Sequence, residues 1–180
     1  GDNLIPHFSE DELDDFSDAA TRADPSFVRA RPVVEAPEMF DAKFFGILPR
    51  EAELMDPQAR IFLELCQHAL EDAGIDPSRP PGAIGVFGGS SPSTYLLANL
   101  MTDRAALETY TTTYQLGNYN LLTGNSTDSL VTRVAHKLDL KGPAIAMGTA
   151  CSTSLTTISQ AVQSLRAGQM DAALAGGVSI

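Results

Sequence analysis

The sequence predicts an α/β fold with parallel strands, and three features carry that prediction. An apolar run over residues 144–147 precedes a helical pattern over residues 152–167, and "MDAALAGGVSI" comes next as a second apolar run. A strand, a helix and a strand of these lengths form a crossover between parallel strands. A capped helix from Asp56 and a short buried strand ending at two glycines add further α and β elements. The expected class is therefore α/β.

Length and composition limit the kinds of protein that this chain can be. It has 180 residues, about one domain, and 43% of them are apolar, which is enough for a core. No apolar stretch reaches the roughly 18 residues of a membrane helix, and no secretion signal opens the chain. The net charge of −11 argues against a nucleic-acid partner, which would need a basic face. We expect neither a membrane nor a nucleic-acid partner.

Residues 1–35 form an acidic, irregular leading segment. Only "HFSEDELDDF" is a helical candidate there, and the prolines of "RARPVVEAPEMF" predict extended or irregular connections. The charge pattern is that of a solvated segment. The acidic residues are Asp2, Glu10, Asp11, Glu12, Asp14, Asp15, Asp18 and Asp24.

The first well-defined helix begins within "MDPQARIFLELCQHALEDAGIDP". Asp56 is a suitable N-cap, Pro57 suits the first helical position, and Gly74 supplies the stop. Helical spacing predicts an apolar stripe that makes Cys66 a structural thiol. The stripe consists of Phe62, Leu65, Cys66, Ala69 and Ala73.

The middle of the chain alternates short elements. Ala83 to Phe87 is predicted to be a buried strand that ends at Gly88-Gly89, without the spacing of a phosphate-binding loop. Helices are expected around residues 95–101 and 105–110, followed by a loop rich in Thr, Tyr and Asn up to residue 127. "DSLVTRVAHKLDL" is helical again, and Gly142-Pro143 ends that pattern. Its apolar face consists of Leu130, Val131, Val134 and Leu138.

Cys151 lies between the end of an expected strand and the first turn of an expected helix. Helical spacing places it on an apolar stripe of residues 151, 155, 158, 162 and 165. Unpaired N–H groups and the helix dipole favour a thiolate there, by about 0.3–1 kcal/mol. Small neighbours leave room for a carbonyl carbon. These effects alone leave two interpretations open, a nucleophile or a buried core thiol.

The other residues that could carry chemistry form no recognisable site. The two cysteines, Cys66 and Cys151, make neither a disulfide framework nor a CxxC pair, which suits a reducing, cytoplasmic location. The three histidines, His7, His68 and His136, share no metal-ligand spacing with them. We expect no metal and no bound cofactor.

Four long segments, in order, resemble the β-ketoacyl synthases, above all those of modular type I polyketide synthases. "GPAIAMGTACSTSL" resembles the active-site segment, and "FDAKFFGILPREAELMDPQARIFLELCQHALEDAGIDP" is similar to the family's N-terminal signature. "QSLRAGQMDAALAGGVSI" resembles the segment after the active-site helix, and "HFSEDEL" with "PSFVRARPVVE" resembles the upstream connections. The resemblance is weakest over residues 92–125. It identifies residues 1–180 as a partial β-ketoacyl synthase N-terminal domain. Residues 144–180 are its strand–helix–strand unit, in which the helix follows Cys151.

The resemblance implies a thiolase-like fold with α/β/α/β/α layers, of which this chain is the first half only. The family's opening strand is not found before Gly1, and the family's two histidine contexts, His-Gly-Thr-Gly-Thr and Asn-Ile-Gly-His, do not occur. We therefore expect a fragment that is inactive by itself. Gly148 stands where the family usually has Asp, and Thr153 replaces a common Ser.

The implied activity is that of a ketosynthase, an acyltransferase of the 3-oxoacyl-[acyl-carrier-protein] synthase type. Cys151 would accept an acyl group from the phosphopantetheine of an acyl carrier protein, with its backbone N–H as an oxyanion donor. A decarboxylative Claisen condensation with a malonyl-type extender would follow. The implied partners are acyl carrier protein, acyltransferase and other polyketide synthase domains, together with a second copy that pairs near residues 144–147.

Several alternatives remain at this point. A fatty-acid-type synthase would use the same cysteine, whereas a chain-initiating decarboxylase of this fold would carry glutamine there. A cysteine-dependent acyl hydrolase would need a nearby histidine, which "STSLTTISQ" lacks. The last alternative is a piece with no activity of its own.

Overall fold

A computed structural model describes residues 3–13, 17–112 and 119–180. Its contacts divide the chain into two units, Gly1–Ala36 and Pro37–Ile180, and we describe each by itself. Residues 14–16 of the expected "HFSEDELDDF" helix and residues 113–118 of the expected loop lie outside the described residues.

The acidic unit contains two short helices, α1 (Glu10–Leu13) and α2 (Ala19–Arg22). The second helix was not predicted. It begins at Asp18, whose carboxylate accepts a hydrogen bond of 2.7 Å from the backbone N–H of Thr21. This bond holds the pKa of Asp18 below its usual value. The prediction of a single helical candidate was wrong because a one-turn helix depends on its cap and has no apolar periodicity.

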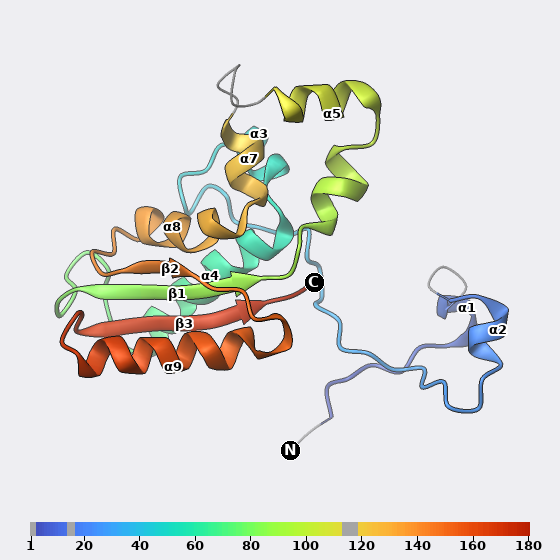
Figure 1. Cartoon of the computed structure of the whole chain (residues 1–180), viewed down its shortest axis with the longest axis horizontal. Helices are drawn as coiled ribbons and strands as arrows, with labels where there is room; N and C mark the ends of the chain where they lie inside the picture. Colours follow the sequence, from blue (N-terminus) through green and yellow to red (C-terminus); the bar gives the residue numbers. More distant parts are fainter. Residues whose placement is uncertain (1–2, 14–16, 113–118) are drawn as a thin grey trace. The chain divides into compact units, whose positions relative to one another are not determined.

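The second unit is built on a parallel sheet of three strands in the order β2-β1-β3 (Figure 1). The strands are β1 (Ile84–Ser90), β2 (Ala144–Ala146) and β3 (Ala172–Val178). The prediction that β1 ends at Gly88-Gly89 was wrong, because these glycines pair in register with Gly176 and Gly177. At Gly88 a Cβ would lie 3.0 Å from a Val131 methyl carbon, so the missing side chain lets a helix approach the strand.

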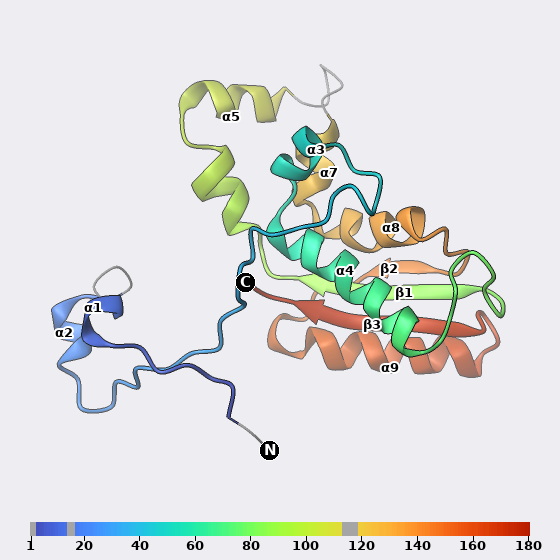
Figure 2. The same ribbon diagram turned by 180° about the vertical axis from the view of Figure 1, so that it is seen from behind.

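Helices α4 (Pro57–Asp72) and α8 (Thr127–Lys137) pack against one face of this sheet (Figure 2). As expected, α4 is capped by Asp56 and followed by Gly74 with a φ of 66°. The expected face of α8 is also confirmed, since Leu130, Val131, Val134 and Leu138 are all buried.

The predicted stripe of α4 was only partly right. Phe62 and Cys66 are buried, but Leu65 is 53% exposed, and Ala69 and Ala73 are exposed too. The buried face is shifted by one position, to Phe62, Leu63, Cys66 and Leu70. Neighbouring apolar residues on a helix offer two overlapping stripes, and only tertiary packing decides between them.

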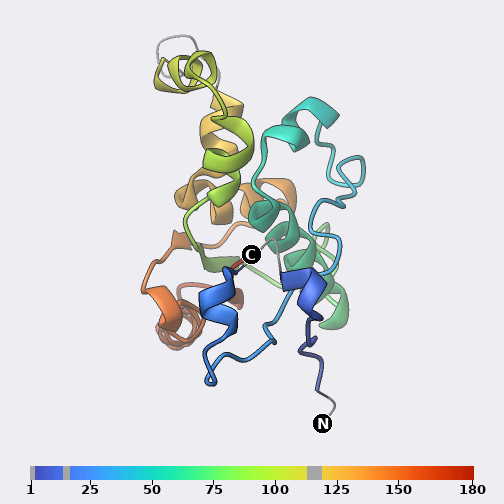
Figure 3. The ribbon, with the colours of Figure 1, turned by 90° about the vertical axis from the view of Figure 1, so that its right-hand side faces the viewer.

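Helix α9 (Thr153–Arg166) covers the opposite face of the sheet (Figure 3). A short 3-10 turn, η2 (Ala150–Ser152), leads into it. The residues that α9 buries against the strands are small: Thr157, Ala161 and Ser164. The predicted apolar stripe exists but faces away from the strands, as Leu155, Ile158, Val162 and Leu165 are exposed. The sequence pattern found this stripe but did not indicate which face of the helix meets the sheet, where small side chains pack beside the glycine-containing strand β3.

Further helices lie between β1 and α8. They are the π-helical turn η1 (Leu96–Leu100), α5 (Arg104–Thr111) and α7 (Tyr119–Asn125). The first two were expected, but α7 replaces part of the predicted loop. Its Gly124 passes so close to Leu54 that a Cβ would lie 2.7 Å from the Leu54 carbonyl oxygen. Packing against an element far along the chain therefore selects the helix.

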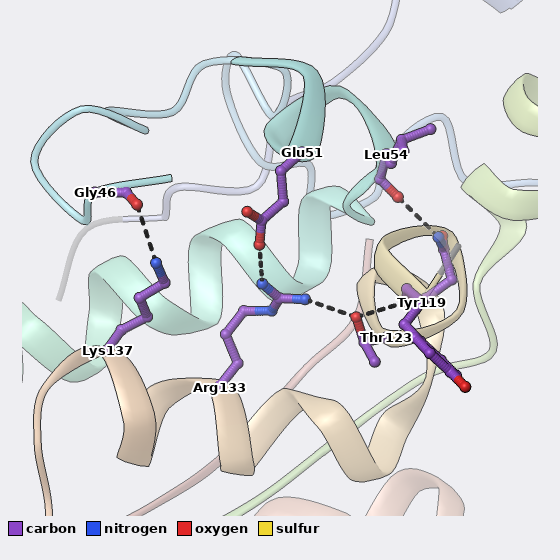
Figure 4. A network of polar contacts seen from close by, with 8 residues as sticks. Gly46, Glu51, Leu54, Tyr119, Thr123, Arg133 and Lys137 are labelled. Atoms are coloured by element: carbon purple, nitrogen blue, oxygen red, sulfur yellow. Dashed lines mark hydrogen bonds and ion pairs between the residues drawn. The ribbon is translucent and has the colours of Figure 1, made fainter. Parts of the chain in front are cut away.

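A polar network joins α8 to helix α3 (Pro49–Leu54) and to α7 (Figure 4). The Arg133 guanidinium donates to the Glu51 carboxylate at 2.7 Å and to the Thr123 hydroxyl at 3.3 Å. The Lys137 ammonium donates to the Gly46 carbonyl oxygen at 3.1 Å. Within the described residues, no helix is long and apolar enough to cross a membrane.

Candidate active site

A cavity of about 690 Å³ opens at the carboxyl ends of the three parallel strands. This edge is where open α/β sheets commonly bind ligands. The cavity is lined from β1 by Gly89, Ser90, Ser91 and Pro92, from the turn after β2 by Gly148, Ala150, Cys151, Thr153 and Ser154, and from β3 by Gly177, Val178 and Ser179.

The two cysteines have opposite environments. Cys151 is exposed and lines the cavity, whereas Cys66 is buried in the core that α4 shares with the sheet. Burial raises the pKa of the Cys66 thiol to about 12. Since thiolates are the reactive form, Cys66 is inert in the folded protein and Cys151 is the thiol that a substrate can reach.

The residue before Cys151 has an unusual backbone conformation. Ala150 has a φ of 51°, in the left-handed region that a residue with a Cβ avoids at a cost of about 1–2 kcal/mol. Such conformations persist only where the surrounding structure enforces them, and they cluster at functional sites. The Ala150 turn directs the chain from β2 into the first turn of α9 and places Cys151 on the cavity side.

Side-chain hydroxyls hold this turn. The Thr153 hydroxyl accepts from the backbone N–H of Thr149 at 3.0 Å and donates to the carbonyl oxygen of Ala150 at 2.9 Å. The Ser152 hydroxyl donates to the Thr149 carbonyl oxygen at 2.8 Å. The Thr149 hydroxyl donates to that of Thr156 at 3.1 Å, which donates in turn to the Ser152 carbonyl oxygen at 3.0 Å. The run of Ser and Thr around Cys151 is therefore a hydrogen-bonded frame.

Two glycines let this frame lie close to the strand ends. A Cβ at Gly89 would overlap the carbonyl oxygen of Met147, and it would lie 2.7 Å from the methyl carbon of Thr153. At Gly177 a Cβ would lie 2.9 Å from the hydroxyl oxygen of Ser154. Gly148 differs, because a Cβ there meets nothing within 4 Å. Packing therefore favours glycine at positions 89 and 177, and Gly148 leaves open space in the cavity.

A buried polar cluster connects the start of α4 to the cavity, and the sequence pattern did not reveal it. The amide of Gln58 donates to the Asp56 carboxylate at 3.2 Å and accepts from the Ser91 hydroxyl at 2.6 Å. Arg60 donates to the Met55 carbonyl oxygen at 2.7 Å. The sequence signal for this cluster is the set of polar residues at alternate positions of the helix start, Asp56, Gln58 and Arg60. A search for apolar stripes does not detect such a set.

Apart from the thiol of Cys151, no side chain lining the cavity is ionisable. His68 and His136 lie on α4 and α8, the helices on the other face of the sheet from α9. Among the described residues, no group of three His, Cys, Asp or Glu side chains could hold a metal ion. The site therefore consists of an exposed thiol in a neutral, hydroxyl-rich cavity.

The site is an exposed cysteine at the start of a helix, at the carboxyl edge of a parallel sheet. Comparison with known proteins identifies the family to which this α/β fold belongs. The profile of the family described as "Beta-ketoacyl synthase, N-terminal domain" matches residues 1–180. The chain belongs to this family, and the resemblance seen in the sequence is confirmed.

Curated relatives are polyketide synthases. A phenolphthiocerol/phthiocerol polyketide synthase protein of Mycobacterium tuberculosis (strain ATCC 25618 / H37Rv) is 46% identical over 182 residues, which cover 100% of this chain and 12% of that protein. The pikromycin polyketide synthase component PikAII of Streptomyces venezuelae is 40% identical over 190 residues, covering 100% of this chain and 5% of that protein.

Solved ketosynthases share the fold. Ketosynthase twelve from the bacillaene polyketide synthase of Bacillus amyloliquefaciens matches with a TM-score of 0.79 and 30% identity, over 98% of this chain and 29% of that one. The ketosynthase from module 1 of the bacillaene synthase of Bacillus amyloliquefaciens FZB42 matches with a TM-score of 0.72 and 35% identity, over 98% and 29%. The chain corresponds to the N-terminal part of a polyketide synthase ketosynthase domain, within a family of acyltransferase-type condensing enzymes.

Proposed function

We propose that Cys151 is the acyl-accepting nucleophile of a ketosynthase domain that extends a polyketide chain. The observation that carries the proposal is the exposed Cys151 thiol in a cavity at the carboxyl ends of the parallel strands. Its neighbours are glycine, alanine, serine and threonine, which leave room for a thioester carbonyl beside the sulfur. The polyketide synthase names of the relatives support the substrate class.

The proposed reaction has two steps. The Cys151 sulfur attacks the carbonyl carbon of an acyl group carried on phosphopantetheine, and the carrier's thiol leaves with a proton as the new thioester forms. A malonyl-type extender on a second carrier then loses carbon dioxide. Its carbanion attacks the Cys151 thioester, and the cysteine leaves as a thiolate that regains a proton. Dividing the transfer in this way is the general advantage of a covalent intermediate.

The backbone N–H of Cys151 is the proposed donor to the oxyanion of both tetrahedral intermediates. It belongs to the first turn of a helical segment, where N–H groups have no intrahelical acceptor. A fixed donor at the position of developing charge lowers the barrier without reorganisation. The strained Ala150 turn sets the direction of this N–H group.

The proposal places the acid–base groups outside this chain. The cavity lining holds no histidine, and the chain spans 29% of the solved ketosynthases that it matches. We therefore assign the activity to the complete domain, an acyltransferase of the 3-oxoacyl-[acyl-carrier-protein] synthase type, and expect none from the 180 residues alone.

The proposed partners follow from the same chemistry. Acyl carrier protein domains deliver both substrates, and an acyltransferase domain supplies the extender. A second copy of the domain is the proposed neighbour of β2, which is an edge strand of the described sheet. The reaction needs Cys151 as a free thiol, which suits the cytoplasm, where disulfides are rare.

A condensation assay with the complete domain tests the proposal. The domain is supplied with an acylated carrier protein and a malonyl carrier protein, and the 3-oxoacyl product is measured by mass spectrometry. Cys151→Ala should abolish condensation, whereas Cys66→Ala, the matched control at the buried cysteine, should retain it. Full condensation by Cys151→Ala would exclude the proposed nucleophile.

A further inference from the structure

We propose that Thr153 is a positioning residue whose hydroxyl holds the Ala150–Cys151 turn in the geometry that acyl transfer needs. The inference rests on the proposed function of Cys151. Thr153 lies two residues after the nucleophile, at the first position of α9, and lines the same cavity. It does not itself react, but it acts through the backbone that carries the nucleophile.

One hydroxyl group of Thr153 bridges the backbone on both sides of the turn. Its oxygen accepts from the N–H of Thr149 at 3.0 Å, and its proton goes to the carbonyl oxygen of Ala150 at 2.9 Å. These two backbone groups flank the left-handed Ala150, whose φ is 51°. The bridge therefore fixes the conformation of the one residue that sets the direction of Cys151.

Ala150 needs this restraint because it is not glycine. A residue with a Cβ leaves the left-handed region unless its neighbours hold it there. If the turn relaxed, the N–H and side chain of Cys151 would rotate together away from their present directions. Ser152 and Thr156 bond to other atoms, the carbonyl oxygens of Thr149 and Ser152. The Thr153 hydroxyl is thus the side-chain group that is bonded to the carbonyl of Ala150.

The methyl group of Thr153 orients the hydroxyl. It lies over Gly89 at the end of β1, 2.7 Å from where a Cβ at that position would be. A β-branched side chain has few χ1 states, and this contact with the strand selects among them. Serine would keep the hydroxyl and its hydrogen bonds but lose the methyl contact, so the hydroxyl would be held less firmly. The pairing of Gly89 with threonine explains why this position carries both groups.

The test compares three variants of the complete domain. Thr153→Val keeps the methyl contact and removes both hydrogen bonds, whereas Thr153→Ser keeps the hydroxyl. Thr132→Val is the matched control, because that exposed threonine of α8 donates to the carbonyl oxygen of Asp128 at 3.2 Å on the other face of the sheet. The rate of Cys151 acylation by an acyl thioester is measured over substrate concentration, together with thermal unfolding.

Thr153→Val should be acylated about tenfold more slowly at saturating substrate. This loss is expected because the variant lacks the two hydrogen bonds that hold the reactive geometry. Its KM should stay within about twofold of that of the unaltered domain, since the cavity keeps its shape. Thr153→Ser should recover most of the rate, and Thr132→Val should match the unaltered domain. A role in folding alone would lower the melting temperature and leave the acylation rate of the folded protein unchanged.

The outcomes separate this inference from the proposed function. An unchanged acylation rate in folded Thr153→Val, with no acylation in Cys151→Ala, would overturn the role of Thr153 and leave the nucleophile in place. Acylation that persists in Cys151→Ala would overturn the function itself. Should Thr153→Val fail to fold, Thr153→Ala takes its place with the same expected loss, and an unchanged rate there would also overturn the inference.

Discussion

The Cα of Gly89 lies so close to Met147 that a Cβ atom at position 89 would overlap the Met147 carbonyl oxygen. The same approach is secured by a hydrogen bond of 2.9 Å from the Met147 N–H to the carbonyl oxygen of Gly88. The end of β1 and the start of the Cys151 turn are therefore locked together. A side chain at this point must displace either the strand or the turn.

Gly89→Ala should destabilise the domain by about 1–3 kcal/mol, the usual cost of overpacking, and should lower the reactivity of Cys151. Gly148→Ala is the matched control, because a Cβ at position 148 meets nothing within 4 Å in this chain. Urea unfolding measures the free energy, and iodoacetamide labelling measures the thiol. Equal free energies of unfolding and equal labelling rates of the two variants would show that the close contact at Gly89 affects neither stability nor the reactivity of Cys151.

The two thiols should differ in their reaction with alkylating reagents. In the folded domain, iodoacetamide should modify exposed Cys151 well before buried Cys66, and denaturant should remove the difference. Peptide mass spectrometry at a series of times measures the two rates. Equal rates in a folded sample would remove the basis for calling Cys151 the accessible nucleophile.

The Cys66 thiol should make stability depend on pH in alkaline solution. Its pKa of about 12 in the folded protein lies above the value of about 8.5 for an unfolded thiol. Below about pH 8.5 the thiol keeps its proton in both the folded and the unfolded protein, and its contribution to folding stability is fully present. Above about pH 8.5 the thiol ionises only in the unfolded protein, which favours unfolding. The free energy of unfolding should therefore fall between pH 7.5 and 9.5 by about 1 kcal/mol more than in Cys66→Ala.

Urea unfolding at the two pH values measures this difference. Cys66→Ala is the necessary control because other groups also titrate in this range, and only the difference between the two proteins belongs to Cys66. Parallel pH dependence in both proteins would contradict the burial of the Cys66 thiol in the core.

The Arg133–Glu51 pair should contribute to stability more than a surface pair does. The two side chains are 11% and 21% exposed, and the pair joins α8 to α3 (Figure 4). Glu51→Gln should cost about 1–3 kcal/mol, since it leaves a largely buried guanidinium without its counter-charge. Glu108→Gln is the control, because Glu108 pairs with Arg104 at the surface. The Arg104 and Glu108 side chains are 92% and 66% exposed, so the variant should cost less than about 0.5 kcal/mol. Equal costs would contradict the anchoring role of the pair.

The sequence predicted those parts of the fold that local chemistry determines. The cap at Asp56, the stop at Gly74, the apolar face of α8 and the strand–helix–strand unit around Cys151 were all correct. It could not predict α7 or the extension of β1, because close backbone approach at Gly124 and Gly88 decides them and involves partners far along the chain.

The orientation of helix α9 was the part of the fold that the sequence pattern predicted least well. The sequence revealed its apolar stripe but not the face that meets the sheet, which carries the small residues Thr157, Ala161 and Ser164. A helix that buries small residues on one side and carries large apolar residues on the other is suited to lie between two layers. The position of Cys151 was predictable from its turn, whereas the hydroxyl frame around Ala150 was visible only in three dimensions.

The apolar stripe of α9 should be buried in the complete domain. Leu155 is 74% exposed in this chain. If a second layer covers it, Leu155→Ala should lower the stability of the complete domain by about 2–5 kcal/mol, as for a buried leucine. A loss below about 0.5 kcal/mol in urea unfolding would show that the stripe stays open to solvent.

The most direct test of the central proposal is the site at which an acyl group becomes attached. The complete domain is incubated with an acyl thioester, digested, and mapped by mass spectrometry. The acyl group should be found on Cys151 as a thioester that hydroxylamine removes, and Cys66 should stay unmodified. An acyl group attached to another residue, or none on Cys151 of a folded and condensing domain, would contradict the account.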